Sequence, residues 1–484
     1  MIQIQVNHEM FAYDMYHISK AFFPGRKIKQ TVDTTCKEIV KIIIDNDIFV
    51  MNEKECSQSM DRKARKHAVN QKVYHWMSQV TEKQLAWGIM TGVRPTKPML
   101  QLLEKGKTDE EILDWMEEHY CVTRERAQLG FEVAKRERQL LERLDYKNGY
   151  SLYIGIPFCP TTCTYCSFTS YSIAEWKDRV DEYLDVVCKE LTFVARVSAD
   201  KKLNTIYIGG GTPTTLEADQ LNRLLTHLES HFSYADLKEI TVEAGRPDSI
   251  TKEKLEVLKA HNISRISINP QTMQQKTLDI IGRKHTVDDI RRAYAMARDM
   301  GFENINMDLI AGLPGETVED MRDTLEQIKK MAPDSLTVHA LAMKRASKMS
   351  QEKQAEGDAE DEARIVYTLS EMIALSGDYA KQMDLEPYYL YRQKNIAGNF
   401  ENVGYAKVDK AGIYNILIME ERQSIVAVGA GASTKIVVPK EAVIIDEKTG
   451  NQKQIIRCEN VRDVEQYMSR IDEMIERKGE LLWH

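Results

Sequence analysis

The 484-residue chain has no long apolar segment: no run of about 18 apolar residues, the length that crosses a bilayer, occurs in it. Residues 1–7 also lack the basic stretch followed by an apolar one that marks a secretion signal. We therefore expect a cytoplasmic protein with no membrane span.

Excess positive charge is missing as well. The 66 Lys and Arg residues are outnumbered by 74 Asp and Glu residues, which gives a net charge of −8. A general attraction to nucleic acid is thus not expected, although a local basic pocket for a small anion is compatible with this balance. Only 24 Gly and 12 Pro occur, which excludes a collagen-like or low-complexity chain, and 43% hydrophobic residues suit a globular protein.

Short apolar runs alternate with amphipathic segments of helical length from residue 150 onward. The apolar runs are 151–156, 205–208, 239–242, 265–268, 304–310 and 335–341, and the helical segments between them are 174–197, 219–232, 252–261, 287–300 and 317–331. This alternation predicts right-handed βα units and a parallel sheet. Six units favour an α/β fold with a partial (β/α)6 TIM-like barrel, and an open doubly wound sheet is the alternative.

The pattern divides the chain into three parts. Residues 1–148 are expected to form an N-terminal mixed α/β domain, with a strand at 2–6 and helices at 73–90, 110–119 and 127–145. The core spans 149–345. Residues 346–484 form a C-terminal extension packed beside the barrel and covering its active site, in which we expect an acidic loop up to 362, a helix at 363–375 and strands at 388–391, 414–420, 424–428 and 436–438.

Three of the eight cysteines stand close together. Cys159, Cys163 and Cys166 form a C-x3-C-x2-C motif directly after the first predicted strand of the core, whereas Cys36, Cys56, Cys121, Cys188 and Cys458 are isolated. Without an export signal, a disulfide framework is not expected. A structural zinc site usually takes four ligands in two pairs, and no second pair occurs. Three cysteines on a [4Fe–4S] cluster leave one iron open to a chelating ligand. A zinc knuckle completed by a distant ligand, or three simple buried thiols, is the alternative.

Polar or glycine-rich positions also lie in, at the end of, or directly after the next four predicted strands. The turn Gly209-Gly210-Gly211-Thr212-Pro213 follows the second, Glu243 ends the third, Gln271 follows the fourth, and Asp308 lies in the fifth. Each could by itself be a cap or a tight turn. Because active sites of parallel barrels gather at the carboxyl ends of the strands, we expect these positions to share one site with the cysteines.

The cysteine motif and the Gly-Gly-Gly-Thr-Pro turn resemble those of radical S-adenosylmethionine (SAM) enzymes. The resemblance implies a [4Fe–4S] cluster held by Cys159, Cys163 and Cys166, whose open iron binds the amino and carboxylate groups of SAM. Reductive cleavage of SAM then gives a 5′-deoxyadenosyl radical. It further implies SAM contacts from Tyr153, Tyr165, Gly210, Gly211, Thr212, Glu243, Gln271, Arg283, Asp308 and Ala342.

Within that superfamily the chain resembles the oxygen-independent coproporphyrinogen III oxidases, or dehydrogenases, of the HemZ-type branch. The shared segments are 153–159, 308–316, 91–97, 387–395 and 398–402. The resemblance implies oxidative decarboxylation of two propionates of coproporphyrinogen III, or a related tetrapyrrole, to vinyl groups. It also implies an electron donor such as a flavodoxin or ferredoxin. Candidate partners for the substrate carboxylates are Arg392, Lys394, Tyr391, Arg345 and Lys344.

One position departs from the decarboxylating branch. That branch has a further cysteine two places after the third, where this chain has Phe168, as the related heme-chaperone branch does. The sequence therefore leaves open whether the protein decarboxylates or only binds heme. The role of residues 1–148 stays open too, between a substrate lid, a docking surface and structural support.

Overall fold

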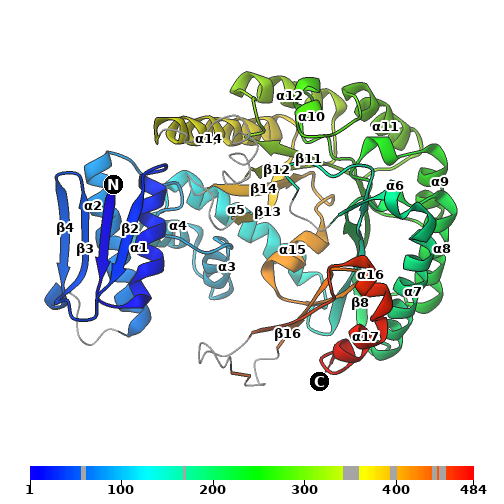
Figure 1. Cartoon of the computed structure of the whole chain (residues 1–484), viewed down its shortest axis with the longest axis horizontal. Coiled ribbons are helices and arrows are strands. Elements are labelled where there is room, and N and C mark those ends of the chain that lie inside the picture. Colours follow the sequence, from blue (N-terminus) through cyan, green and yellow to red (C-terminus); the bar gives the residue numbers. More distant parts are fainter. Residues whose placement is uncertain are drawn as a thin grey trace.

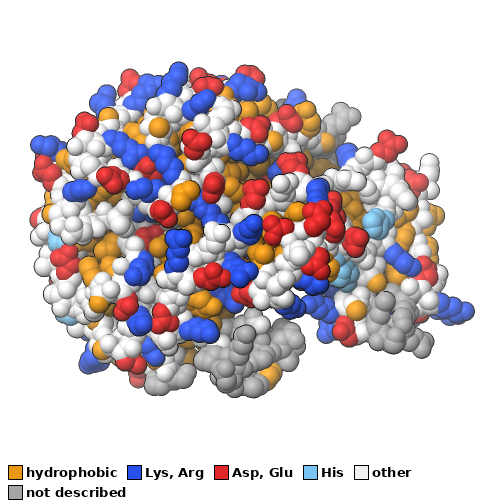
Figure 2. Space-filling view, turned by 180° about the vertical axis from the view of Figure 1, so that it is seen from behind, with side chains coloured by type: hydrophobic (Ala, Val, Ile, Leu, Met, Phe, Trp, Pro, Cys, Tyr) orange, Lys and Arg blue, Asp and Glu red, His pale blue; other side chains and the backbone are white. Residues whose placement is uncertain are grey.

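The computed structural model describes residues 1–55, 61–166, 170–341, 359–392, 400–438, 444–445 and 454–483. It shows a small α/β unit at one end and a large curved sheet lined on its outer side by helices (Figure 1). Acidic and basic side chains are intermixed over the face shown in Figure 2. In the described residues, no helix is both long enough and apolar enough to cross a membrane.

The centre of the large sheet is made of parallel strands in chain order. These are β5 (Gly149–Ile156), β8 (Lys202–Gly210), β9 (Glu239–Glu243), β10 (Arg265–Ser267), β11 (Ile305–Ala311) and β12 (Ser335–Ala340). The connecting helices include α7 (Val180–Val197), α8 (Ala218–His231), α9 (Lys252–Ala260), α10 (Gln275–Ile280), α11 (Val287–Asp299) and α12 (Val318–Met331). The strand order never reverses as it does in a doubly wound sheet, so the predicted partial barrel is confirmed.

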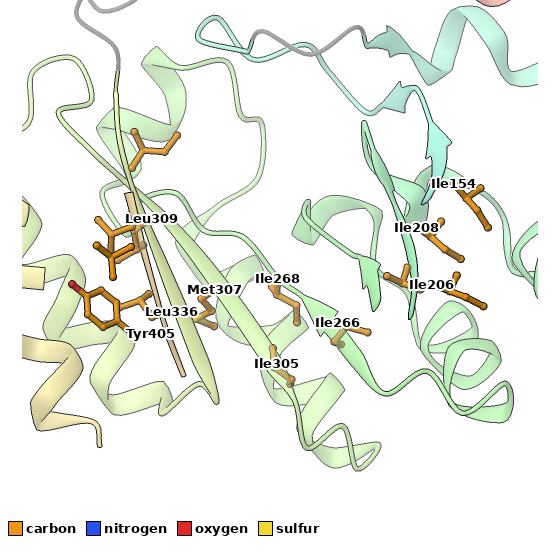
Figure 3. Packing of buried hydrophobic residues seen from close by; sticks show 14 of the residues in the cluster. Ile154, Ile206, Ile208, Ile266, Ile268, Ile305, Met307, Leu309, Leu336 and Tyr405 are labelled. Atoms are coloured by element: carbon orange, nitrogen blue, oxygen red, sulfur yellow. The ribbon is translucent and has the colours of Figure 1, made fainter. Parts of the chain in front are cut away.

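Alternation along the strands separates an apolar outer face from a more polar interior. Ile154, Ile208 and Ile266 are fully buried in the core between the sheet and the helices, where Figure 3 shows them with residues of neighbouring strands. Tyr153 and Tyr207 point the other way, into the barrel, and their rings stack with centroids 6.1 Å apart. The period of two therefore places polar side chains inside the barrel.

The C-terminal part extends both edges of this sheet. At one edge β15 (Ser424–Val428) pairs parallel with β5, followed by the antiparallel strands β16 (Ser433–Val437) and β17 (Ile455–Glu459). At the other edge β14 (Glu401–Ala406) pairs antiparallel with β12, and β13 (Glu386–Arg392) pairs with β14. Helices α14 (Ala359–Gln382), α16 (Val464–Ser469) and α17 (Ile471–Gly479) complete this part. Counted over the described residues, the sheet thus has eleven strands, seven of them mutually parallel.

The prediction of a strand at 414–420 is wrong, because these residues form helix α15 (Ile413–Glu420). A short apolar run rich in isoleucine does not by itself distinguish a strand from a buried helix. Here Tyr414, Ile416 and Leu417 are buried together as one face of a helix. The predicted helix at 73–90 is also displaced, since α2 (Arg62–Thr81) ends at Glu82, whose φ of 54° is left-handed. The expected loop up to residue 362 lies mostly outside the described residues.

The N-terminal residues form a separate sheet in the order β2 (Ile28–Val32), β1 (Ile2–Val6), β3 (Glu38–Ile44) and β4 (Asp47–Asn52). Helices α1 (Glu9–Phe22) and α2 pack on it, and together they enclose a core of their own. Helices α3 (Lys97–Glu104), α4 (Asp109–Tyr120) and α5 (Arg124–Glu142) instead contribute to the core of the barrel. The short elements are η1 (Glu53–Glu55), β6 (Phe158–Cys159), β7 (Tyr171–Ser172), α6 (Ile173–Trp176), η2 (Lys177–Arg179), η3 (Pro213–Thr215) and η4 (Pro247–Ser249).

Candidate functional site

The cysteine motif lies on the loop at the carboxyl end of β5. The Cys166 N–H donates to the Cys163 carbonyl at 3.1 Å, which folds the end of the motif into a turn. The Thr161 hydroxyl donates to the Gly282 carbonyl at 3.0 Å and so fixes the loop to the segment after α10. Burial raises the pKa of Cys159, and the nearby thiols of Cys166 and Cys163 raise it further. The three thiols therefore lie in one neighbourhood, and all are partly exposed.

Among the described residues, no three His, Cys, Asp or Glu side chains converge closely enough to hold one metal ion. The three cysteines of a four-iron cluster each bind a different iron, so their sulfurs stand farther apart than the ligands of one zinc ion.

The glycine-rich turn after β8 packs against the backbone of the cysteine loop. The N–H groups of Gly211 and Thr212 donate to the carbonyls of Ile156 and Phe158 at 2.8 and 2.7 Å. A Cβ atom at position 211 would lie 2.5 Å from the Phe158 oxygen, so this approach requires glycine there. Gly210 has a φ of 111°, which glycine adopts readily. The Thr212 hydroxyl lies 3.5 Å from the Cys159 sulfur.

Glu243 ends β9, Gln271 follows β10, and Asp308 lies in the middle of the adjacent strand β11. The backbone N–H of Gln271 donates to the Asp308 carbonyl at 2.9 Å, and the Gln271 carbonyl accepts from the N–H of Ile310 at 2.9 Å. This pairing holds Gln271 against β11 with a φ of 68°. Glu243 accepts a hydrogen bond from the Tyr207 hydroxyl. Burial raises the pKa of Glu243 to about 7, the Tyr207 bond opposes this shift, and Asp308 adds to it.

Arg283 is buried beside the cysteine loop. Its guanidinium donates to the Asn269 carbonyl at 2.5 Å and to the Tyr165 hydroxyl at 3.4 Å. The Arg283 Nε and the Asn269 Oδ1 are buried, and neither has a hydrogen-bond partner among the described residues. Buried polar atoms are normally paired, so these two atoms indicate a place for a polar ligand.

A second buried arginine was missed by the sequence analysis. Arg246 follows β9 and donates to the Thr161 carbonyl at 3.1 Å and to the Cys163 sulfur at 3.7 Å. Its position in Glu243-Ala244-Gly245-Arg246-Pro247, just past a strand end, was the available signal. Ala342 and Phe168 lie outside the described residues.

Comparison with known proteins identifies the family. Residues 153–328 match the radical SAM superfamily. The chain is 41% identical over 403 residues to the "oxygen-independent coproporphyrinogen-III oxidase-like protein HemZ" of Bacillus subtilis, covering 82% of this chain and 77% of that protein. The chain belongs to the HemN/HemZ family of radical SAM proteins.

Two further relatives carry different names. The heme chaperone HemW of Bacillus subtilis is 38% identical over 192 residues, which cover 40% of this chain and 50% of HemW. The structure of coproporphyrinogen III oxidase (HemN) from Escherichia coli superposes with a TM-score of 0.52 at 21% identity, over 70% of this chain and 73% of HemN. At that identity the superposition shows a shared fold.

As a radical SAM protein, the chain uses a [4Fe–4S] cluster and SAM. The site is chemically suited to both: three thiols on one loop can serve three irons, and the unpaired Arg283 and Asn269 atoms can meet the polar end of SAM. The individual ligand assignments stay predictions.

Proposed function

We propose that this radical SAM protein is an oxygen-independent coproporphyrinogen III dehydrogenase. Each of two propionates loses a hydrogen atom, carbon dioxide and one electron, and becomes a vinyl group. The observation that carries the proposal is the 41% identity to the HemZ protein, since a match of 403 residues extends well beyond the barrel.

When bound, the cluster and SAM supply a strongly oxidising carbon radical. In the proposed arrangement Cys159, Cys163 and Cys166 hold the cluster. The turn at Gly210, Gly211 and Thr212 receives the amino end of SAM, and Arg283 its carboxylate. By the family resemblance, the remainder of SAM would be contacted by Tyr153, Tyr165, Glu243, Gln271, Asp308 and Ala342. A site closed to water would protect that radical from side reactions.

The chain's own substrate contacts are proposed on the inner wall of the barrel. His339, on β12, has its Nδ1 3.1 Å from the Tyr391 hydroxyl, and both side chains are partly exposed. Burial lowers the pKa of His339, against the opposing effect of Asp308, and the lowered pKa favours the neutral imidazole. A neutral donor can hold a propionate without stabilising the carboxylate charge as strongly as an arginine would, and that charge is lost as carbon dioxide leaves.

Of the other candidate carboxylate partners, Arg392 is engaged within the protein. Its guanidinium donates to the Met90 carbonyl at 2.7 Å, and it is almost fully buried. Lys344, Arg345 and Lys394 lie outside the described residues.

The decisive test is turnover. Anaerobically reconstituted protein, SAM, coproporphyrinogen III and a reduced flavodoxin or ferredoxin should give protoporphyrinogen, detected by mass, together with 5′-deoxyadenosine. Cys163→Ala should abolish both products. SAM cleavage by the wild-type protein without any loss of carbon dioxide from the substrate would contradict the proposal.

A second candidate, a heme chaperone without decarboxylase activity, is favoured by the HemW similarity and by Phe168. It predicts stoichiometric heme binding that survives gel filtration, with no protoporphyrinogen in the same incubation. The two candidates differ in their product, so one experiment separates them.

A further inference from the structure

All hydrogen-bond donors of the Arg246 side chain are used, and some of them bind the cysteine loop. Besides the bonds to the Thr161 carbonyl and the Cys163 sulfur, its guanidinium donates to the Thr161 hydroxyl at 3.1 Å. On its other side it forms a bidentate pair with Asp248, with Nε–Oδ1 3.0 Å and Nη2–Oδ2 2.8 Å. All five N–H donors of the side chain are therefore used, and the residue is only 3% exposed.

Asp248 is itself held from a third direction. The buried His285 places its Nδ1 3.4 Å from Asp248 Oδ1. Burial would raise the pKa of Asp248, but His285 and Arg246 outweigh this and hold it well below its usual value, so the carboxylate stays ionised. The guanidinium consequently has a fixed orientation. One edge is hydrogen-bonded to the Asp248 carboxylate and the other to the cysteine loop.

A positive charge beside a cysteine ligand affects how readily an iron–sulfur cluster is reduced. Reduction adds one negative charge to the cluster, and hydrogen bonds to ligand sulfur and nearby positive charge stabilise the reduced form. The arginine side chain stays protonated, so its effect is permanent. Burial strengthens it, because the charge is poorly screened by solvent.

We propose that Arg246 is a positioning residue that raises the reduction potential of the cluster and thereby lets a cellular donor reduce it. The inference rests on ligation of the cluster by Cys163. It is independent of whether the protein decarboxylates coproporphyrinogen or binds heme.

The test is a potentiometric titration of the reconstituted full-length protein, without SAM, followed by electron paramagnetic resonance of the reduced cluster. In Arg246→Gln the equilibrium constant for one-electron reduction should fall about tenfold, which corresponds to a potential about 59 mV more negative. In Asp248→Asn the guanidinium loses its counter-charge, so the potential should shift the other way.

The matched control is Arg265→Gln. Arg265 is equally buried but lies at the amino end of β10, where it donates to Asn304 and to the Lys410 carbonyl, so its loss should leave the potential unchanged.

Two results would overturn the inference. One is an Arg246→Gln protein with four irons and an unchanged potential, which would mean that Arg246 only stabilises the structure of the loop. The other is an unchanged or more negative potential in Asp248→Asn. If Arg246→Gln does not retain iron, the potential of Asp248→Asn alone tests the inference. Undiminished iron in Cys163→Ala would instead refute the ligation itself, whatever Arg246 does.

Discussion

Gly211 shows at the scale of one residue how the site depends on backbone contact. Because a Cβ there would lie 2.5 Å from the Phe158 oxygen, Gly211→Ala must separate the glycine turn from the cysteine loop. We expect a loss of about 1–3 kcal/mol in the free energy of unfolding, as for other overpacked positions, and a lower iron content after reconstitution.

Iron per chain and the urea midpoint measure this effect. Gly92→Ala is the control, since, its chain neighbours aside, no described residue has an atom within 4 Å of a Cβ built there. Equal iron content in the two variants would show that the turn moves away at no cost to the site.

At the scale of elements, a buried carboxylate joins α7 to the C-terminal helices. Glu190 accepts hydrogen bonds from the Tyr467 hydroxyl at 2.6 Å, the Asn460 amide at 2.9 Å and the Gly429 N–H at 3.0 Å, and it pairs with Lys478. Both charged side chains are fully buried. Both oxygens of Glu190 are hydrogen-bonded and its charge is paired with that of Lys478, which is the condition under which buried charges are tolerated.

Lys478→Met should therefore be costly, because it leaves the Glu190 charge buried without its cation. We expect a loss of about 3–5 kcal/mol, seen as a lower urea midpoint. Lys189→Met breaks an exposed pair with Asp472 between the same two helices and should cost less than about 1 kcal/mol. Similar losses in both variants would mean that burial adds nothing to this ion pair.

The elements also show what the sequence could and could not predict. The cysteine spacing and the alternation of βα units are local signals, and they predicted the loop and the barrel. Helix α15 was missed because its isoleucines have the same pattern as a buried strand, and only packing decides between the two. Strand β14 was missed because its role depends on pairing with β12. Arg246 was missed because its contact with Thr161 joins residues 85 positions apart.

At the scale of the whole molecule, a buried carboxyl couples stability to pH. Glu137, on α5, is fully buried, and neither of its oxygens has a hydrogen-bond partner among the described residues. Burial raises its pKa well above 4.5, and the nearby Glu420 raises it further. Above a pH of about 4.5 the Glu137 carboxyl therefore stays protonated in the folded state, whereas it loses its proton in the unfolded chain. The free energy of unfolding thus falls as the pH rises above about 4.5.

Glu137→Gln should remove that dependence. Relative to the wild-type protein, its urea midpoint should be higher at pH 8 and nearly equal at pH 5. The exposed Glu142 on the same helix provides the control, since Glu142→Gln should show no such difference. A Glu137→Gln protein that is less stable at both pH values would show that the carboxyl has partners the folded state needs.

The two edges of the central sheet have a consequence for the order of synthesis. In the described residues the outer edge of β5 pairs with β15 and the outer edge of β12 pairs with β14, and both partners follow the central strands in the chain. A nascent chain that has reached residue 340 thus exposes two unpaired strand edges, which are prone to association with other chains. Pairing with β14 and β15 therefore closes these two edges only after all six central strands have been synthesised.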